Sequence, residues 1–298
     1  MLPISDDIAS IWSLQPPENP GKNHTPHFET ERYRNPAKFV MGTLSIQSRI
    51  RRIQRHLGIE DDGLVGPVTL SRLEEVLGIG HGAANLIVSF RGVEMLIAFE
   101  ISSPSHYRRK LSKPHWPGGA SGVTIGIGYD LGYNTIAQVE KDWKGKLSDA
   151  TLQELLGVTG LRGIDAREAS IRLRELEIVI PLEMARSVFF RNTLPRYARQ
   201  TRKAYPGVEA LPHDAQAALL SLVYNRGTSK SGARRREMKA IEKEVRNRSL
   251  SGIAGQIRAM KRLWIGKGLP GLLTRRDKEA ELVENSERVY LEEELIYL

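Results

Sequence analysis

The chain has 298 residues, with 44 Lys and Arg against 35 Asp and Glu, which gives a formal net charge of +9. A surplus of this size favours polyanionic partners such as nucleic acid, anionic lipid or the acidic bacterial wall. The absence of cysteine excludes a disulfide framework, a thiolate zinc site and a cysteine nucleophile. The length predicts one large domain or two unequal ones.

Residues 1–38 are rich in proline and polar residues, which predicts a loosely ordered leader. Asp6 and Asp7 stand where a signal peptide needs basic residues, and no apolar segment follows them. We therefore expect synthesis in the cytoplasm without a signal peptide. The longest apolar window, 86–99, is interrupted by charged residues, so no membrane span is predicted. The sequence predicts no metal site and no cofactor.

Residues 39–79 predict a small helical domain. Apolar residues at helical spacing indicate a first helix that ends at Gly58, and Pro67 is placed to begin a second. The second helix is expected to bury four apolar residues: Leu70, Leu73, Val76 and Leu77.

The turn between these helices carries the pattern Asp62-Gly63, Gly66-Pro67 and Thr69. This pattern resembles the small three-helix type of peptidoglycan-binding domain. A third helix upstream of Thr43 is not obvious. The alternative is a basic helix–turn–helix that binds DNA through the arginines of the first helix.

Residues 85–298 predict an α+β domain that is mainly helical. Helical periodicity dominates this part of the chain, apart from a short strand segment within 122–132. One helix is expected to end at Glu100. The later helices are expected over 148–156, 167–176, 181–198, 214–224, 238–245, 253–264 and 274–282.

The strand segment, Gly122-Val-Thr-Ile-Gly-Ile-Gly-Tyr-Asp-Leu-Gly132, presents Thr124 and Asp130 on a glycine framework. Glu100 ends an apolar helix before it. A carboxyl in an apolar setting can serve as an acid, while a second polar group positions water, which is the arrangement of a glycosidase. A dinucleotide loop is rejected, because the glycine spacing does not lead directly into a helix.

The segment after Glu100 resembles the signature of phage-type muramidases (glycoside hydrolase family 24), in which a buried Glu precedes a Thr-Ile-Gly-Ile-Gly strand. Gly118 stands where that signature has an aspartate, six residues before Thr124. The pesticin-like branch of the lysozyme superfamily matches better, because its aspartate follows the threonine, in the position of Asp130. The resemblance continues over residues 218–227 and 268–276, with Glu279.

This resemblance implies a lysozyme-like fold and hydrolysis of the β-1,4 bond between N-acetylmuramic acid and N-acetylglucosamine. Glu100 would be the general acid, Asp130 would hold the water or stabilise the transition state, and Thr124 would orient the water. Five flanking residues are candidates for binding the glycan, and for the aromatic ones packing within the hairpin is the alternative: Trp116, Tyr129, Tyr133, Asn225 and Arg226.

A muramidase of this kind would act as an endolysin or as an antibacterial toxin or effector. Its partners would be peptidoglycan glycan strands, with an immunity protein and secretion or holin machinery as further candidates, and no nucleic acid. It would work in the periplasm or cell wall. The remaining alternatives are a lytic transglycosylase that needs only Glu100, a non-catalytic wall-binding protein and a nucleic-acid-binding protein that uses the +9 charge.

Overall fold

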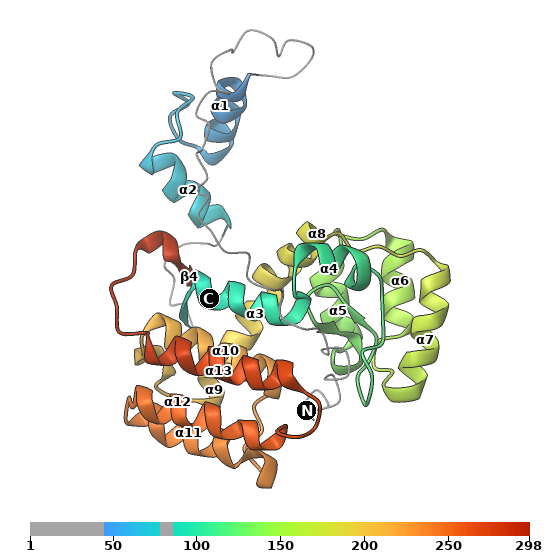
Figure 1. Cartoon of the computed structure of the whole chain (residues 1–298). Coiled ribbons are helices and arrows are strands. Elements are labelled where there is room, and N and C mark those ends of the chain that lie inside the picture. The colour runs from blue at the N-terminus through green and yellow to red at the C-terminus, as the bar shows by residue number, and fades with distance from the viewer. Residues whose placement is uncertain (1–44, 78–85) are drawn as a thin grey trace, which may run out of the picture. The chain divides into compact units, whose positions relative to one another are not determined.

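The computed structural model describes residues 45–77 and 86–298, which belong to two compact units (Figure 1). The predicted leader, residues 1–38, lies outside the described residues. Within the two described ranges, no helix combines the length and the apolar character that crossing a membrane requires.

The described part of the smaller unit contains α1 (Ile46–Leu57) and α2 (Pro67–Leu77). Both predicted boundaries are confirmed: Gly58 caps α1 in the left-handed conformation, with φ of 70°, and Pro67 begins α2. The buried Gln54 connects these elements. Its amide donates to Asp62 Oδ1 at 2.7 Å and to Thr69 Oγ1 at 3.0 Å, and its Oε1 accepts from the Gly63 amide at 2.8 Å.

The predicted burial of the apolar face of α2 is wrong for most of its residues. Leu70, Val76 and Leu77 are 48%, 64% and 57% exposed. Two short helices offer too little surface to cover each other's apolar faces. Hydrogen bonds of Gln54, rather than an apolar core, therefore connect α1, the turn and α2.

The larger unit is mainly helical, which confirms the predicted class. The single helix predicted over 181–198 is divided into α8 (Leu182–Val188) and α9 (Leu194–Ala204), because a π-helical turn, Phe189–Thr193, separates the two. The helices are α3 (Phe90–Ile101), α4 (Pro104–His106), α5 (Ile136–Trp143), α6 (Asp149–Gly157), α7 (Gly163–Glu175), α8 (Leu182–Val188), α9 (Leu194–Ala204), α10 (His213–Arg226), α11 (Arg236–Arg246), α12 (Leu250–Ala259) and α13 (Pro270–Glu284).

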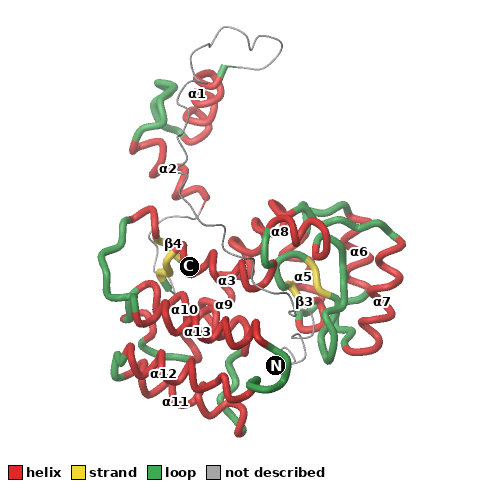
Figure 2. The backbone as a smooth tube through the Cα atoms, viewed as in Figure 1, coloured by secondary structure: helices red, strands yellow, loops and turns green. Residues whose placement is uncertain are grey.

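Two small antiparallel sheets complete this unit (Figure 2). The hairpin of β2 (Thr124–Ile125) and β3 (Tyr129–Asp130) lies where the strand segment was predicted. The pairing of β1 (Ile87–Ser89) with β4 (Leu295–Tyr297) was not predicted, because three residues are too few to show an alternating pattern.

Helix α10 forms the centre of the larger unit. All of its residues except His213 and Asn225 are buried, which is typical of a helix that is covered on every side. Helices α3, α9 and α13 and strand β1 pack against it. This packing brings the end of α3, the end of α10 and the first turns of α13 into one region.

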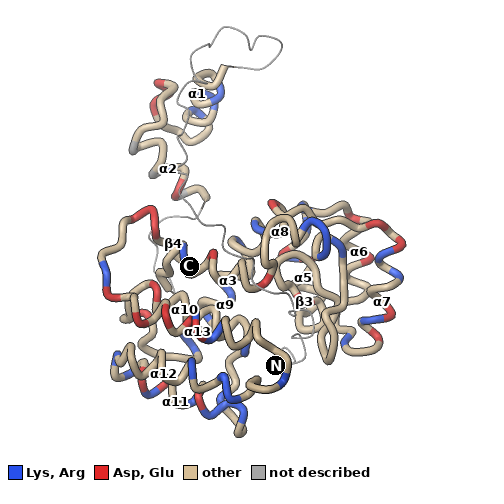
Figure 3. The backbone as a smooth tube through the Cα atoms, in the orientation of Figure 1, with Lys and Arg blue, Asp and Glu red and all other residues tan. Residues whose placement is uncertain are grey.

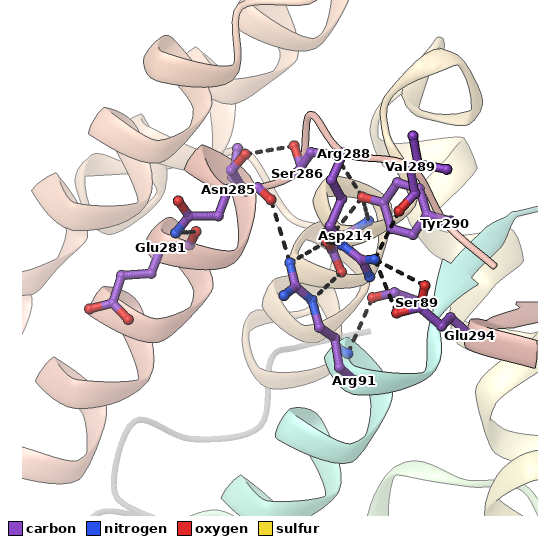
Figure 4. A network of polar contacts seen from close by, with 12 residues as sticks. Ser89, Arg91, Asp214, Glu281, Asn285, Ser286, Arg288, Val289, Tyr290 and Glu294 are labelled. Atoms are coloured by element: carbon purple, nitrogen blue, oxygen red, sulfur yellow. Dashed lines mark hydrogen bonds and ion pairs between the residues drawn. The ribbon is translucent and has the colours of Figure 1, made fainter.

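Asp214, in the first turn of α10, ties the C-terminal segment to this core (Figure 4). Its carboxylate accepts from Arg91 Nε at 2.9 Å, Arg288 Nε at 3.1 Å and the Tyr290 hydroxyl at 3.0 Å. Its position at the N-terminus of a helix favours a negative charge as well. These contacts hold the segment before β4 against α3 and α10.

Candidate active site

Glu100 lies in the last turn of α3, with its side chain 18% exposed. Arg275 of α13 donates from Nη1 to Glu100 Oε1 at 2.7 Å. One side of Glu100 therefore faces a guanidinium group rather than the wholly apolar surroundings that its helix predicts. The periodicity of α3 could not reveal this contact, because the partner comes from a helix much later in the chain.

The other oxygen of Glu100 faces the hairpin at Gly128. A Cβ atom at Gly128 would lie 3.0 Å from Glu100 Oε2 and 3.0 Å from the Tyr224 hydroxyl. Gly128 also has φ of 62°, a conformation that side chains disfavour. The absence of a side chain at this position allows the carboxyl of Glu100 to lie directly against the hairpin.

Thr124 and Asp130 are direct partners in the register of β2 and β3. Residues that stand opposite each other in an antiparallel pair project from the same face, so both side chains lie on one side of the hairpin. Thr124 is only 7% exposed, and its hydroxyl has no hydrogen-bond partner within the described part of the chain. Leaving a buried hydroxyl without a hydrogen bond costs free energy, so such a group normally pairs with a bound water or ligand.

Two glycines form a cradle for the Asp130 carboxylate. Oδ1 accepts from the amides of Gly122 at 3.0 Å and Gly132 at 2.7 Å, and Oδ2 accepts from Gly122 at 3.1 Å. A Cβ at Gly122 would stand 2.3 Å from the Gly132 nitrogen, so this close approach requires glycine. Burial raises the pKa of Asp130 to about 6, although the amides oppose the shift.

The raised pKa of Asp130 makes its ionisation unfavourable for folding. The resulting loss of folding stability is absent when the pH is below the carboxyl's ordinary pKa of 3.8, grows as the pH rises to about 6, and is fully present above that pH. Asp130→Asn, whose carbonyl oxygen can still accept from Gly122 and Gly132, should therefore be more stable than the wild type by roughly 2 to 3 kcal/mol near pH 7.5. Urea unfolding at about pH 7.5 and about pH 4 measures the difference. An equal gain at both pH values would contradict titration of Asp130 as the cause.

A pocket of about 190 Å³ borders the hairpin on the side of Asp130 and Gly128. Helices α9 and α10 supply much of its wall, including Arg196, Tyr197 and Tyr224. Glu100 and Thr124 do not border this pocket. Gly128, which lies against Glu100, connects the pocket wall to the proposed acid.

Of the five residues predicted to bind glycan, three border the pocket: Tyr129, Tyr133 and Arg226. Tyr129 is buried, donates to Asp142 Oδ2 at 2.8 Å and packs edge-on against Trp143. These contacts favour the packing alternative for Tyr129. Tyr133 is more exposed and donates to the Ala120 carbonyl at 3.1 Å.

Arg226 is only 3% exposed, and it donates to the Arg234 carbonyl at 3.0 Å. The other two predicted residues do not border the pocket. Trp116 donates to the Ser121 carbonyl at 3.1 Å, and Asn225 accepts from Arg276 at 3.2 Å. Their contacts support the hairpin and the buried arginines rather than the pocket wall.

Sequence reasoning missed Arg196 and Tyr197 of α9. Arg196 pairs with Asp142 at 2.9 Å and lies over the Tyr129 ring, so it anchors the base of the pocket. No motif marks either residue, because the sequence of α9 has the pattern of an ordinary helix with several basic residues. Arg275 and Arg276 form ion pairs with Glu279, at 3.2 Å and 3.0 Å.

Residues 97–203 match a family model described as a domain of unknown function (DUF8812). This segment contains Glu100, Thr124, Asp130 and Tyr197, whereas Arg275 lies outside it. No curated protein matches the chain. Within residues 45–77 and 86–298, no group of three or more His, Asp or Glu residues is placed to hold a metal ion.

Proposed function

We propose that the larger unit is a lysozyme-like glycosidase that hydrolyses the β-1,4 bond between N-acetylmuramic acid and N-acetylglucosamine in peptidoglycan. One observation carries this proposal: Glu100 lies against the glycine turn of a hairpin in which Thr124 and Asp130 form the cross-strand pair one position beyond Ile125 and Tyr129. An acid, a hydroxyl with no partner among the described residues and a second carboxylate are thereby gathered at one small hairpin. Glycoside hydrolysis commonly uses two carboxyl groups with separate roles.

Glu100 is suited to the role of general acid because its two oxygens have different surroundings. Arg275 donates to Oε1, which can accept that hydrogen bond whether or not the acid carries a proton. Oε2 faces the hairpin at Gly128, so it is the oxygen placed to carry the proton. In the proposed step this proton passes to the glycosidic oxygen as the bond from that oxygen to the anomeric carbon breaks.

Asp130 is suited to accept a proton from the attacking water. Burial raises its pKa to about 6, closer to the working pH than for an ordinary carboxyl, and the amides of Gly122 and Gly132 fix its orientation. The hydroxyl of Thr124, on the same face, provides a second contact for that water. The two residues therefore complement the acid Glu100.

The smaller unit would bind the wall and so raise the local concentration of the enzyme on an insoluble polymer. Lys and Arg are placed on α1 and around α11 (Figure 3), and the whole chain carries +9, which suits the acidic bacterial wall. We propose peptidoglycan glycan strands as the partner, in the context of an endolysin or an antibacterial effector that acts in the periplasm or cell wall.

Digestion of purified peptidoglycan by the full chain, followed by mass analysis of the soluble fragments, tests the function. We expect fragments that end in reducing N-acetylmuramic acid. The Glu100→Gln protein, purified in parallel, controls for contaminating hydrolases. Fragments that end in reducing N-acetylglucosamine, or no soluble fragments at all, would overturn the proposal.

A lytic transglycosylase is the second candidate, and one observation favours it. Both oxygens of Asp130 accept from backbone amides, which suits a carboxylate that only shapes the hairpin. A transglycosylase would need Glu100 alone and would release anhydro-muramic ends instead of reducing ends. The same mass analysis separates the two reactions, because the anhydro product lacks one water.

A further inference from the structure

Tyr197 differs from every other tyrosine that the structure describes. The seven others each donate their hydroxyl hydrogen to a protein acceptor. Three of these border the same pocket as Tyr197, and their acceptors are Asp142 for Tyr129, Ala120 for Tyr133 and Ile127 for Tyr224. The Tyr197 hydroxyl makes no hydrogen bond to any residue in the described ranges, so it can donate to a bound molecule.

The surroundings of Tyr197 place it beside the proposed chemistry. The ring centroids of Tyr197 and Tyr224 lie 4.5 Å apart. The Tyr224 hydroxyl and Glu100 Oε2 each lie 3.0 Å from the position that a Cβ atom would take at Gly128. Tyr197 also borders the pocket together with Gly128 and Asp130. The phenol therefore belongs to the pocket wall that contains Asp130 and Gly128, the glycine against which Glu100 lies.

The charge state of Tyr197 suits a hydrogen-bond donor. Burial is the main cause that raises the pKa of its phenol, and the carboxylates of Glu100 and Asp130 raise it further, although Arg196 opposes them. The hydroxyl thus keeps its hydrogen throughout the neutral range. Tyr197 cannot act as a base there, but it can donate one hydrogen bond.

We propose that Tyr197 is a further catalytic residue, whose hydroxyl donates a hydrogen bond to the oxygen of the attacking water. This inference rests on the proposed hydrolysis. The water would give one hydrogen to Asp130, which borders the pocket together with Tyr197, and would accept from Tyr197 with one lone pair. Its other lone pair is then the one that attacks the sugar.

In this step the water oxygen forms a bond to the anomeric carbon, and the bond from that carbon to the glycosidic oxygen breaks. Glu100 gives its proton to the departing oxygen, while Asp130 takes one proton from the water. No further reactant is required. The hydrogen bond from Tyr197 fixes the direction of the water, so it acts on the chemical step more than on substrate binding.

Tyr197→Phe in the full chain tests this role, because phenylalanine retains the ring that packs against Tyr224. With soluble glycan strands as substrate, we expect kcat to fall by about 10²- to 10³-fold, as for the loss of one preorganised hydrogen-bond donor. KM and the thermal midpoint should stay near the wild-type values. Tyr205→Phe is the matched control, since its buried hydroxyl donates only to Met238 Sδ, at 3.4 Å, and does not border the pocket.

An active wild type together with an undiminished Tyr197→Phe overturns the inference and leaves the proposed hydrolysis intact. A rise in KM at constant kcat also overturns it, because the hydroxyl would then bind the glycan rather than the water. An equal loss in Tyr205→Phe would assign the effect to packing and overturn it as well. A wild type that releases no fragments overturns the proposed function, and the inference with it.

Discussion

Glu100→Gln is expected to lower the release of reducing ends from peptidoglycan by about 10²- to 10⁴-fold, the usual contribution of a positioned general acid. Glutamine has the shape of the glutamic acid but no proton to give at Oε2, the oxygen that faces Gly128. Its amide oxygen can still accept from Arg275, so the variant should fold as the wild type does. Initial rates with soluble glycan strands, together with the thermal midpoint, measure both effects.

Glu94→Gln is the matched control on the same helix. Glu94 pairs with Arg186 at 2.6 Å, and both side chains are about one third exposed, so little stability or activity should depend on it. An unimpaired Glu100→Gln would remove Glu100 from the role of acid. Equal losses in both variants would show that the helix, rather than one carboxyl, is sensitive to substitution.

The helices of this protein were largely predictable because they are long enough to repeat their pattern. Helix α10 shows a nearly continuous apolar run, and the termini of α1 and α2 carry the glycine and proline that such positions favour. The pairing of β1 with β4 was not predictable. It joins segments about 200 residues apart, and each strand has only three residues, which are too few to show an alternating apolar pattern.

The hairpin could be predicted as part of a candidate site because its polar residues lie within eleven consecutive residues. The register of the hairpin places Thr124 opposite Asp130. Gly122 and Gly132 lie where their backbone amides donate to the Asp130 carboxylate. The contact of Arg275 with Glu100 depends on how α13 packs, which no local pattern encodes. Tyr197 was missed for the same reason, since only the packed structure shows that its hydroxyl has no acceptor among residues 45–77 and 86–298.

Glu279→Gln is expected to destabilise the larger unit by about 3 to 5 kcal/mol, the usual cost of removing one partner from a buried ion pair. Glu279 is fully buried in α13 and lies 3.2 Å from Arg275 Nε and 3.0 Å from Arg276 Nη2. Burial lowers the pKa of Arg276 to about 10 even though the charge of Glu279 opposes the shift. Without that charge, two buried guanidinium groups would lose the carboxylate they share.

The matched control is Glu281→Gln, two residues further along α13. Glu281 pairs with Lys278 at 2.8 Å, but both side chains are about half exposed, so its loss should cost under about 1 kcal/mol. Urea unfolding of both variants, followed by circular dichroism, measures the difference. If Glu279→Gln unfolds at the same urea concentration as Glu281→Gln, the stability does not depend on compensating the arginines. A large difference would mean that the α13 ion pairs that hold Arg275 beside Glu100 also stabilise the fold.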